Sequence, residues 1–275
     1  MNAAIIGCGY VGRAVARLWS QDLGLAVTTT TTTPENVPAL EAISSRAEVL
    51  SGGDRNALKS ILKDREVALF CMSPRSTSYE DAYLKTAISL AEVAPELPNL
   101  KQVIYTSSYG IYGNRNGEEV TEETPVSPMN SNGEILARTE NVFLSAANKN
   151  LKVCILRLGG IYGPDRELIK IFRRSAGQTR PGSGQGITNW IHLDDIVGVT
   201  EFSRKQQLDG IYNVVDGLHL TRKELLDRVM EKHELSPVTW DASQSVERAN
   251  VKVSNQKLKD AGYSFVYPTL CDTDT

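Results

Sequence analysis

The sequence has little of what builds a disulfide scaffold or a metal centre. Its 275 residues include four cysteines and three histidines. Cys8, Cys71, Cys154 and Cys271 are scattered without a Cys-x-x-Cys pair, and the histidines lack the spacing of metal ligands. We therefore expect no metal site, and reduced thiols as in a cytoplasmic protein. A chain of this length buries a sizeable apolar core without such crosslinks.

Long apolar runs and an excess of one charge are absent as well. No stretch approaches the roughly 20 apolar residues that span a membrane, and the N-terminus lacks the pattern of a signal peptide. The 30 Lys and Arg residues nearly balance the 33 Asp and Glu residues, which gives a net charge of -3. These absences predict a globular cytoplasmic protein with neither a nucleic-acid nor a membrane partner.

Apolar runs of strand length alternate with stretches of helical period along the first half of the chain. Residues 2–6 predict a buried strand, residues 11–20 a helix and residues 25–30 a second strand. Further strands are predicted at residues 67–71, 102–106 and 153–158, and further helices at residues 82–94 and 134–148. This rhythm is typical of a parallel sheet covered by helices on both faces. It predicts an α/β fold with a Rossmann-type doubly wound parallel sheet.

The rhythm changes in the C-terminal part of the chain. Residues 174–186 are rich in Gly, Arg and Ser, which predicts a loop across the mouth of an active site. We expect a nucleotide-binding domain at residues 1–165, with residues 190–210 packing back onto it. Residues 166–189 and 211–275 are expected to form a small C-terminal lobe on the substrate side.

A glycine-rich turn joins the first predicted strand to the first predicted helix. Its sequence, Gly7-Cys8-Gly9-Tyr10-Val11-Gly12, matches G-x-G-x-x-G in the strand-to-helix context that makes this pattern informative. The first glycine permits the tight turn, the second lets the backbone approach a pyrophosphate, and the third lets helix and strand pack closely. The turn therefore predicts a dinucleotide site formed by Gly7, Gly9, Tyr10, Val11 and Gly12. A glycine turn without a ligand is the less favoured alternative.

Threonines stand where NAD sites usually carry an acid. Such sites place Asp or Glu about 20 residues after the turn, where it binds the ribose 2′-hydroxyl. Residues 28–33 are all threonine instead, and we expect Thr29 to contact the cofactor. Hydroxyl groups do not repel a 2′-phosphate, which favours NADP slightly over NAD. Arg13 or Arg55 are candidates to supply positive charge, and the preference of threonine for strands is the alternative explanation of the run.

Two residues follow the strand predicted at residues 67–71, at the edge where such folds bring the backbone against the cofactor. They are Met72 and Ser73, and we expect both to contact the dinucleotide. Cys71, just before them, is more simply explained as a buried core residue.

Three further segments resemble signatures of the extended short-chain dehydrogenase/reductases, the NAD-dependent epimerase/dehydratase family. Residues 104–113, Ile-Tyr-Thr-Ser-Ser-Tyr-Gly-Ile-Tyr-Gly, are similar to the family's fifth-strand signature, and this resemblance assigns Ser108 to the catalytic Ser or Thr. Residues 157–164 resemble the segment that closes over the nicotinamide, which implies a cofactor contact for Leu158. Residues 190–196 resemble the family's His-x-Asp-Asp landmark.

The chain departs from this family at the catalytic Tyr-x-x-x-Lys motif. The two positions fall on Asn132 and Leu136, an alignment supported by Glu140, because the family often carries Glu eight residues after the tyrosine. Asparagine has no proton to exchange near neutral pH, and leucine holds no charge. Residues 131–134, Ser-Asn-Gly-Glu, instead have the spacing of a helix capping box. The chain thus resembles the atypical members of the family, which keep the fold and cofactor site but lack part of the active site.

Other polar residues have both a structural and a functional interpretation. Tyr109 and Tyr112 are candidate proton donors, although packing is favoured for Tyr112. For His192, Asp194 and Asp195, capping of the next helix is favoured over chemistry. The arginines that could bind a phosphate or carboxylate, or form a solvated basic surface, are Arg157, Arg173, Arg174 and Arg180.

The resemblance implies an NAD(P)-binding oxidoreductase or epimerase/dehydratase acting on a small molecule or a sugar nucleotide, with Ser108 in the active site. The missing tyrosine and lysine keep open an alternative, a non-catalytic dinucleotide-binding sensor or regulatory module. Cys8, inside the glycine turn, is a minor candidate for redox sensing. The substrate and the oligomeric state do not follow from the sequence.

Overall fold

The computed structural model describes residues 1–74, 78–244 and 249–270. These residues gather into two compact units, each described separately below. Unit 1 consists of Met1–Ser108, Asn130–Arg157 and Val197–Tyr212, and unit 2 of Tyr109–Met129, Leu158–Ile196 and Asn213–Thr275. The domain boundary expected at residue 165 stays a prediction.

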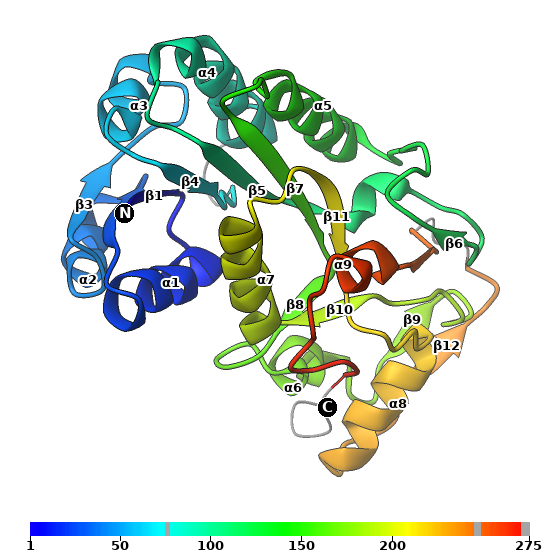
Figure 1. Cartoon of the computed structure of the whole chain (residues 1–275). Helices are drawn as coiled ribbons and strands as arrows, with labels where there is room; N and C mark the ends of the chain where they lie inside the picture. Colours follow the sequence, from blue (N-terminus) through cyan, green and yellow to red (C-terminus); the bar gives the residue numbers. More distant parts are fainter. Residues whose placement is uncertain (75–77, 245–248, 271–275) are drawn as a thin grey trace. The chain divides into compact units, whose positions relative to one another are not determined.

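Unit 1 is built on one sheet whose order is β11-β7-β5-β4-β1-β2-β3, seven strands among the described residues (Figure 1). The pairings of β1 with β2, β1 with β4, β2 with β3 and β4 with β5 are parallel. This order and direction confirm the predicted Rossmann-type doubly wound sheet. The strands are β1 Asn2–Ile6, β2 Ala26–Thr31, β3 Arg46–Val49, β4 Val67–Phe70, β5 Gln102–Ser108, β7 Lys152–Leu158 and β11 Gly210–Val214.

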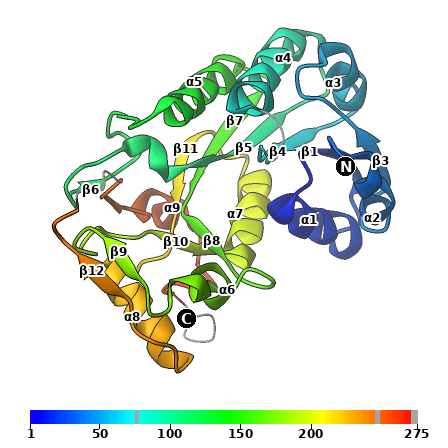
Figure 2. The same cartoon turned by 180° about the vertical axis from the view of Figure 1, so that it is seen from behind.

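Helices cover both faces of this sheet, with α3, α4 and α5 on one face and α1 and α7 on the other (Figures 1 and 2). The helices are α1 Tyr10–Arg17, α2 Val37–Glu41, α3 Arg55–Leu62, α4 Lys85–Val93, α5 Ser131–Ser145 and α7 Leu193–Gln206. Short helical turns lie at Leu18–Asp22, Pro34–Asn36, Glu80–Leu84 and Ala94–Glu96.

The apolar runs of the sequence form the core of unit 1. All four residues of β4 are fully buried, as expected for a central strand of a parallel sheet. Phe143 of α5 packs against Phe70 and Tyr105, with ring centroids 5.1 and 4.5 Å away. The edge strand β3 was not predicted, because two of its four residues, Arg46 and Glu48, are charged.

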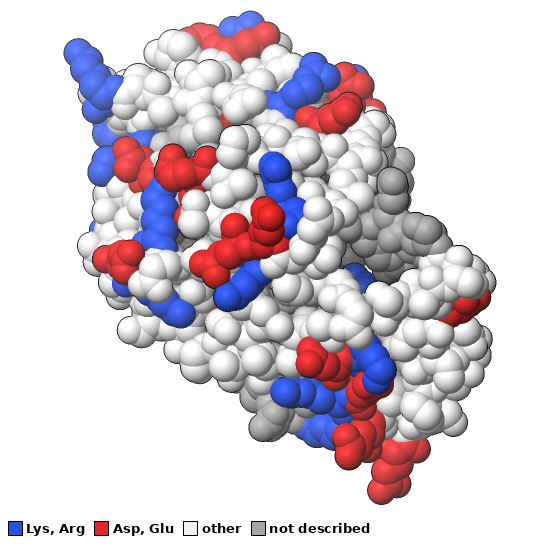
Figure 3. Space-filling view, turned by 90° about the vertical axis from the view of Figure 1, so that its right-hand side faces the viewer, with Lys and Arg blue, Asp and Glu red and all other residues white. Residues whose placement is uncertain are grey.

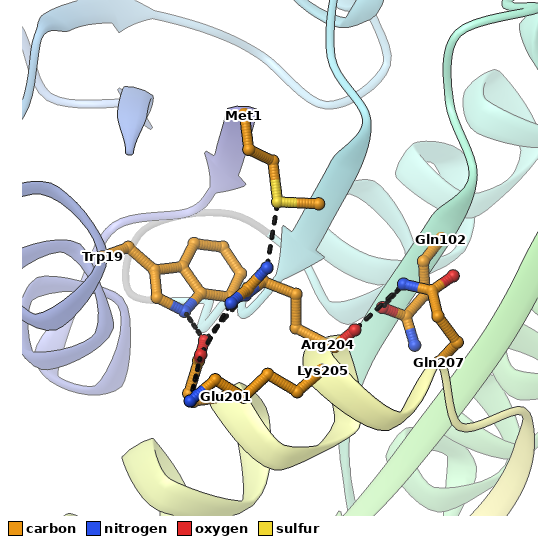
Figure 4. A network of polar contacts seen from close by, with 7 residues as sticks. All are labelled: Met1, Trp19, Gln102, Glu201, Arg204, Lys205 and Gln207. Atoms are coloured by element: carbon orange, nitrogen blue, oxygen red, sulfur yellow. Dashed lines mark hydrogen bonds and ion pairs between the residues drawn. The ribbon is translucent and has the colours of Figure 1, made fainter. Parts of the chain in front are cut away.

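Polar contacts fix the C-terminal half of α7 to the N-terminal part of unit 1 (Figure 4). Buried Glu201 accepts a hydrogen bond from Trp19 Nε1 at 3.0 Å and two from Arg204 at 2.7 Å. Gln102 Nε2, at the start of β5, donates to the Ser203 carbonyl at 2.8 Å and to the Leu208 carbonyl at 3.0 Å. These contacts explain why residues far apart in sequence belong to one unit.

In the part of unit 2 that the structure describes, short strands pair as three two-stranded parallel ribbons, β8 with β10, β9 with β12 and β6 with β13. The segment 174–186, predicted to be a loop, contains strand β9, because Thr179, Arg180 and Pro181 pair with residues 239–241. Helix α8 begins with a capping box, in which Thr221 and Glu224 bond reciprocally. The elements are β6 Glu119–Val120, β8 Gly160–Tyr162, α6 Leu168–Phe172, β9 Thr179–Pro181, β10 Trp190–His192, α8 Arg222–Lys232, β12 Thr239–Asp241, β13 Lys252–Val253 and α9 Gln256–Asp260, with helical turns at Tyr109–Tyr112 and Arg173–Ser175.

Charged side chains are mixed over the face drawn in Figure 3. Acidic and basic groups alternate there in small clusters, and among the described residues in this view none forms a broad area of one sign. This mixture matches the near balance of charges in the sequence.

Candidate functional site

The glycine-rich turn lies where β1 passes into α1, at the carboxyl edge of the unit 1 sheet. Gly7 has a φ of 84°, and a Cβ there would lie 2.8 Å from Met72 Cα. A Cβ at Gly12 would lie 2.9 Å from the Cys71 sulfur, so this glycine lets α1 pack against β4. A Cβ at Gly9 would meet nothing within 4 Å. The first and third glycines are therefore required by packing, whereas the second leaves open space.

Hydrogen bonds from β2 hold the turn in place. Gly7 N–H donates to Thr30 Oγ1 at 3.0 Å, and Cys8 N–H donates to the Thr30 carbonyl at 2.7 Å. The helix that follows begins without a side-chain cap, whereas α3, α5 and α8 are capped by Asp54, Asn130 and Thr221. Because the first N–H groups of a helix have no intrahelical acceptors, the start of α1 suits an external phosphate.

Both cysteines near the turn are buried. Burial raises the pKa of Cys8 to about 12, although the guanidinium groups of Arg13 and Arg17 act in the opposite direction. Burial also raises the pKa of Cys71, whose thiol donates to the Gly7 carbonyl at 3.2 Å. Because the thiolate is the reactive form, these shifts give no support to redox sensing by Cys8.

The end of β2 carries hydroxyl groups and no carboxylate. Thr29 is fully buried, and its Oγ1 lies 3.0 Å from Ser44 Oγ, on the side of β3. Thr31 ends the strand, and its Oγ1 accepts a hydrogen bond from the N–H of exposed Thr33 at 3.1 Å. Thr31 and the residues after it, at the end of the strand, are therefore better candidates for a ribose contact than the buried Thr29. The contact of Thr29 with the cofactor stays a prediction.

The remaining predicted cofactor residues also lie at strand ends. Met72 lies two residues after the end of β4, half-buried against the backbone of Gly7, and Ser73 beside it is exposed. Leu158 is the buried last residue of β7. The turn, the open space at Gly9 and the uncapped start of α1 fit the pyrophosphate of a dinucleotide.

Ser108 is the last residue of β5 and is half-buried. The two tyrosines after it belong to unit 2, where Tyr112 is fully buried and donates to Asn213 Oδ1 at 2.8 Å. That bond favours the packing role predicted for Tyr112. Burial raises the pKa of Tyr109, which keeps its hydroxyl protonated at neutral pH.

The two positions that the sequence aligns with the Tyr-x-x-x-Lys motif lie in the first turns of α5. Asn132 is exposed and Leu136 is half-buried. The predicted capping box at residues 131–134 is wrong by one residue. Asn130 is the cap, and its Oδ1 accepts from Gly133 N–H at 2.9 Å, so that Ser131 is already helical. An asparagine side chain reaches the third helical N–H as well as a serine does.

Arg157 and Glu140 form a buried ion pair inside unit 1. Arg157 Nη2 lies 2.7 Å from Glu140 Oε2, and Arg157 Nε lies 3.2 Å from each carboxylate oxygen. The two side chains are 4% and 3% exposed. Burial and the pairing with Glu140 favour a structural role for Arg157 over the binding of a substrate anion. Each of these residues has its own interpretation in the sequence, and no sequence pattern indicates that they form an ion pair.

In the His-x-Asp-Asp segment, His192 makes the contact at the helix start that capping requires, whereas Asp195 bonds to the C-terminal segment instead. His192 Nδ1 accepts the Asp194 N–H at 3.1 Å, at the start of α7. Asp195 is fully buried, and its carboxylate accepts from Val266 N–H at 2.8 Å, Tyr267 N–H at 2.9 Å and Tyr263 Oη at 3.0 Å. Asp195 thus anchors the C-terminal segment of unit 2.

Asp216 is a buried titratable group that the sequence did not reveal. Its Oδ1 accepts from Leu218 N–H at 2.9 Å, whereas its buried Oδ2 has no partner among the described residues. Burial raises the pKa of Asp216 to about 7, and the nearby Asp195 carboxylate adds to the shift. A lone Asp before Gly after a strand looks like an ordinary turn residue, so no sequence signal marked it.

The described residues contain neither a cluster of metal-binding side chains nor a membrane-spanning helix. No group of three or more His, Cys, Asp and Glu side chains lies close enough together to hold a metal ion. None of the described helices has both the length and the apolar character needed to cross a membrane.

Comparison with known proteins identifies relatives of the whole chain. The sequence profile of the NAD dependent epimerase/dehydratase family matches residues 3–215. Protein YeeZ of Escherichia coli (strain K12) is 26% identical over 275 residues, which cover 97% of this chain and 96% of YeeZ. UDP-glucose 4-epimerase of Thermus thermophilus, solved in complex with NAD, has a TM-score of 0.75 at 21% identity and covers 96% of this chain and 94% of its own.

UDP-glucose 4-epimerase of Thermotoga maritima, solved with UDP-glucose, has a TM-score of 0.79 at 18% identity. The match covers 96% of this chain and 93% of the epimerase. The resemblance drawn from the sequence motifs is confirmed by these matches. The chain belongs to the NAD dependent epimerase/dehydratase family, as an atypical extended short-chain dehydrogenase/reductase.

Proposed function

We propose that the protein binds NADP or NAD through the glycine-rich turn and catalyses hydride exchange between the nicotinamide and a sugar nucleotide or a related small molecule. The observation that carries the proposal is the turn from β1 into α1, which is open at Gly9 and leads into a helix without a side-chain cap. The cofactor would supply the hydride chemistry, while the chain's own residues bind and orient it. The threonines at the end of β2 support a slight preference for NADP.

The relatives support the substrate class. Two UDP-glucose 4-epimerases share the fold of this chain, one solved with NAD and the other with UDP-glucose. A sugar nucleotide is therefore the first substrate class to test. Ser108 is proposed to hydrogen-bond the reacting carbonyl or hydroxyl, because it occupies the family's serine position at the end of β5.

The glycine turn can be tested by binding alone. NADPH or NADH is expected to raise the midpoint of thermal unfolding of the wild-type protein, because a ligand that binds only the folded state stabilises it. Gly9→Ala is expected to leave the midpoint of the ligand-free protein nearly unchanged, since the new methyl group meets nothing within 4 Å. The same methyl group would stand where the backbone approaches the pyrophosphate, so the affinity should fall about 10-fold or more.

Gly186→Ala is the matched control, because a Cβ at Gly186 also meets nothing within 4 Å and its glycine lies in unit 2. Its dinucleotide affinity should equal that of the wild-type protein. If none of the four dinucleotides NAD, NADH, NADP and NADPH shifts the wild-type midpoint, the proposed function fails. Equal binding by Gly9→Ala and wild type would remove the glycine turn as the site.

The proposed role of Ser108 has its own test. With a sugar nucleotide that the protein turns over, Ser108→Ala is expected to lower kcat about 10-fold or more, because one hydrogen bond to the reacting oxygen is lost. Dinucleotide affinity should stay within about 2-fold, measured by titration of the protein with NADPH. Unchanged kcat in Ser108→Ala would exclude this role.

A second candidate function is favoured by one specific observation. Asn132 and Leu136 occupy the positions of the family's tyrosine and lysine, and neither can exchange a proton. A non-catalytic dinucleotide-binding sensor or regulatory module would lose that pair and keep the glycine turn. Cofactor binding without turnover of any sugar nucleotide would favour this candidate over the enzyme.

A further inference from the structure

The residues that directly follow β2 include no acid that could receive a ribose 2′-hydroxyl, and Glu48 on the neighbouring strand β3, opposite Thr30, pairs with Arg46 at 3.1 Å. Thr31 ends the strand, and the next residues, Thr32, Thr33 and Pro34, are uncharged and exposed. The first acid along the chain is the exposed Glu35, in the helical turn Pro34–Asn36. In dinucleotide-binding folds this strand end meets the adenosine ribose, and an acid there excludes a 2′-phosphate. The end of β2 itself carries no such acid, so it does not exclude a 2′-phosphate.

A guanidinium group is held beside this strand end. Arg13 belongs to α1, one residue after the last glycine of the turn, and its Nη2 donates to Asn36 Oδ1 at 3.4 Å. The bond joins the helix of the glycine turn to the helical turn that follows β2. Arg13 is half-buried, and among the residues that the structure describes no carboxylate lies within 4.0 Å of its nitrogens. The Asn36 amide accepts a hydrogen bond from this guanidinium and does not neutralise its charge.

The other arginine considered from the sequence is placed differently. Arg55 begins α3, and its guanidinium lies 3.2 Å from the Glu96 carboxylate and 3.7 Å from that of Glu92. Two carboxylates thus already neutralise Arg55. Of the two candidates for a 2′-phosphate contact, the structure therefore favours Arg13. Arg13 has a neutral partner next to β2, whereas Arg55 is part of an exposed cluster of acidic and basic side chains.

The positive charge of Arg13 also extends to the glycine turn. The guanidinium groups of Arg13 and Arg17 both favour the ionised form of the Cys8 thiol, against the effect of burial on its pKa. Both arginines lie on α1, whose start already suits a negative group. The positive charge of both side chains therefore acts at the start of α1, next to the glycine turn.

From this arrangement we infer that Arg13, positioned by Asn36, binds the 2′-phosphate of NADP or NADPH and gives the protein a preference for these dinucleotides over NAD and NADH. The inference rests on the proposed dinucleotide-binding function and adds the residue that decides between the two cofactors. An arginine presents paired N–H donors that match phosphate oxygens, and the Thr32 and Thr33 hydroxyls offer further donors without negative charge.

The test compares dissociation constants for NADPH and NADH, measured by isothermal titration of the full chain. The wild-type protein should bind NADPH more tightly than NADH by about 10-fold or more. Arg13→Ala should weaken NADPH binding about 10- to 100-fold, as expected for the loss of charge-assisted hydrogen bonds, and change NADH binding less than about 2-fold. Arg17→Ala removes the same charge one turn further along α1, at an exposed position, and should weaken NADPH binding less than about 3-fold.

A second variant, Arg13→Gln, keeps a long polar side chain next to Asn36, removes the charge and should lose the NADPH preference as Arg13→Ala does. This variant answers the question if Arg13→Ala does not fold. Equal affinities of the wild-type protein for NADPH and NADH, unchanged in both Arg13 variants, would overturn the inference and leave dinucleotide binding standing. If the wild-type protein binds neither, the proposed function and the inference fail together.

Discussion

Arg157→Met is expected to lower the free energy of unfolding by about 3–5 kcal/mol. The substitution leaves the Glu140 carboxylate, whose side chain is 3% exposed, in the core of unit 1 without its bidentate partner. Removing one member of a buried ion pair costs this much because the remaining charge has lost both water and its counter-charge. For a chain of this size the midpoint of thermal unfolding should fall by roughly 6–20 °C. Calorimetry or circular dichroism would measure the change.

Two further variants separate the ion pair from mere packing. Glu140→Leu combined with Arg157→Met removes both charges, and should recover most of the lost free energy, because paired buried charges are often replaced by apolar groups at little cost. Arg55→Met breaks the exposed pair with Glu96 and should change the free energy of unfolding by less than about 1 kcal/mol. A double variant no more stable than Arg157→Met would show that the methionine disrupts the core for steric reasons.

This ion pair illustrates what the sequence alone could and could not establish. Glu140 helped to align the missing Tyr-x-x-x-Lys motif, and Arg157 was a candidate for anion binding. The two side chains come into contact only when α5 packs against the sheet next to β7. Periodicity finds each element by itself, but it does not state which side chains of two elements meet.

The fold was predictable for a specific reason. The strands β1, β4 and β7 are mainly apolar, β5 has an apolar stretch and β2 a run of β-branched threonines, and their order along the chain, with helices between them, leaves few topologies. The edge strand β3 escaped prediction because Arg46 and Glu48 break the apolar pattern. In unit 2 the two- and three-residue strands, such as β9 at Thr179–Pro181, pair through backbone hydrogen bonds that leave almost no signature in side-chain polarity.

Some residues of the candidate site could likewise be predicted from the sequence, and others could not. The three glycines could be assigned roles from their spacing and context, because each role depends on the backbone and not on a distant partner. The partners of Arg13 and the burial of Asp216 depend on which segments fold next to them, and the sequence is silent on both. Asn36, in particular, is an ordinary polar residue until the turn after β2 places its amide at Arg13.

Asp216→Asn is expected to make the protein more stable at alkaline pH and to change how its stability depends on pH. Asp216 is buried with Oδ2 unpaired, and burial raises its pKa from 3.8 to about 7 in the folded protein. Between these two values the folded state holds a proton that the unfolded state has released. The free energy of unfolding therefore falls as the pH rises from about 4 to about 7, and it is level above that range. Asparagine has the shape of aspartate and no such titration.

The difference between Asp216→Asn and the wild-type protein should grow by about 2–3 kcal/mol from pH 5 to pH 8, at about 1.4 kcal/mol for each unit of pKa shift crossed. Urea unfolding at the two pH values measures it, and titrations shared by both proteins cancel in the difference. Asp209→Asn, at an exposed position of unit 1, is the control and should show no growth. A constant difference for Asp216→Asn would mean that the carboxylate is ionised at neutral pH. In that case Oδ2 must find a donor that offsets both its burial and the neighbouring charge of Asp195.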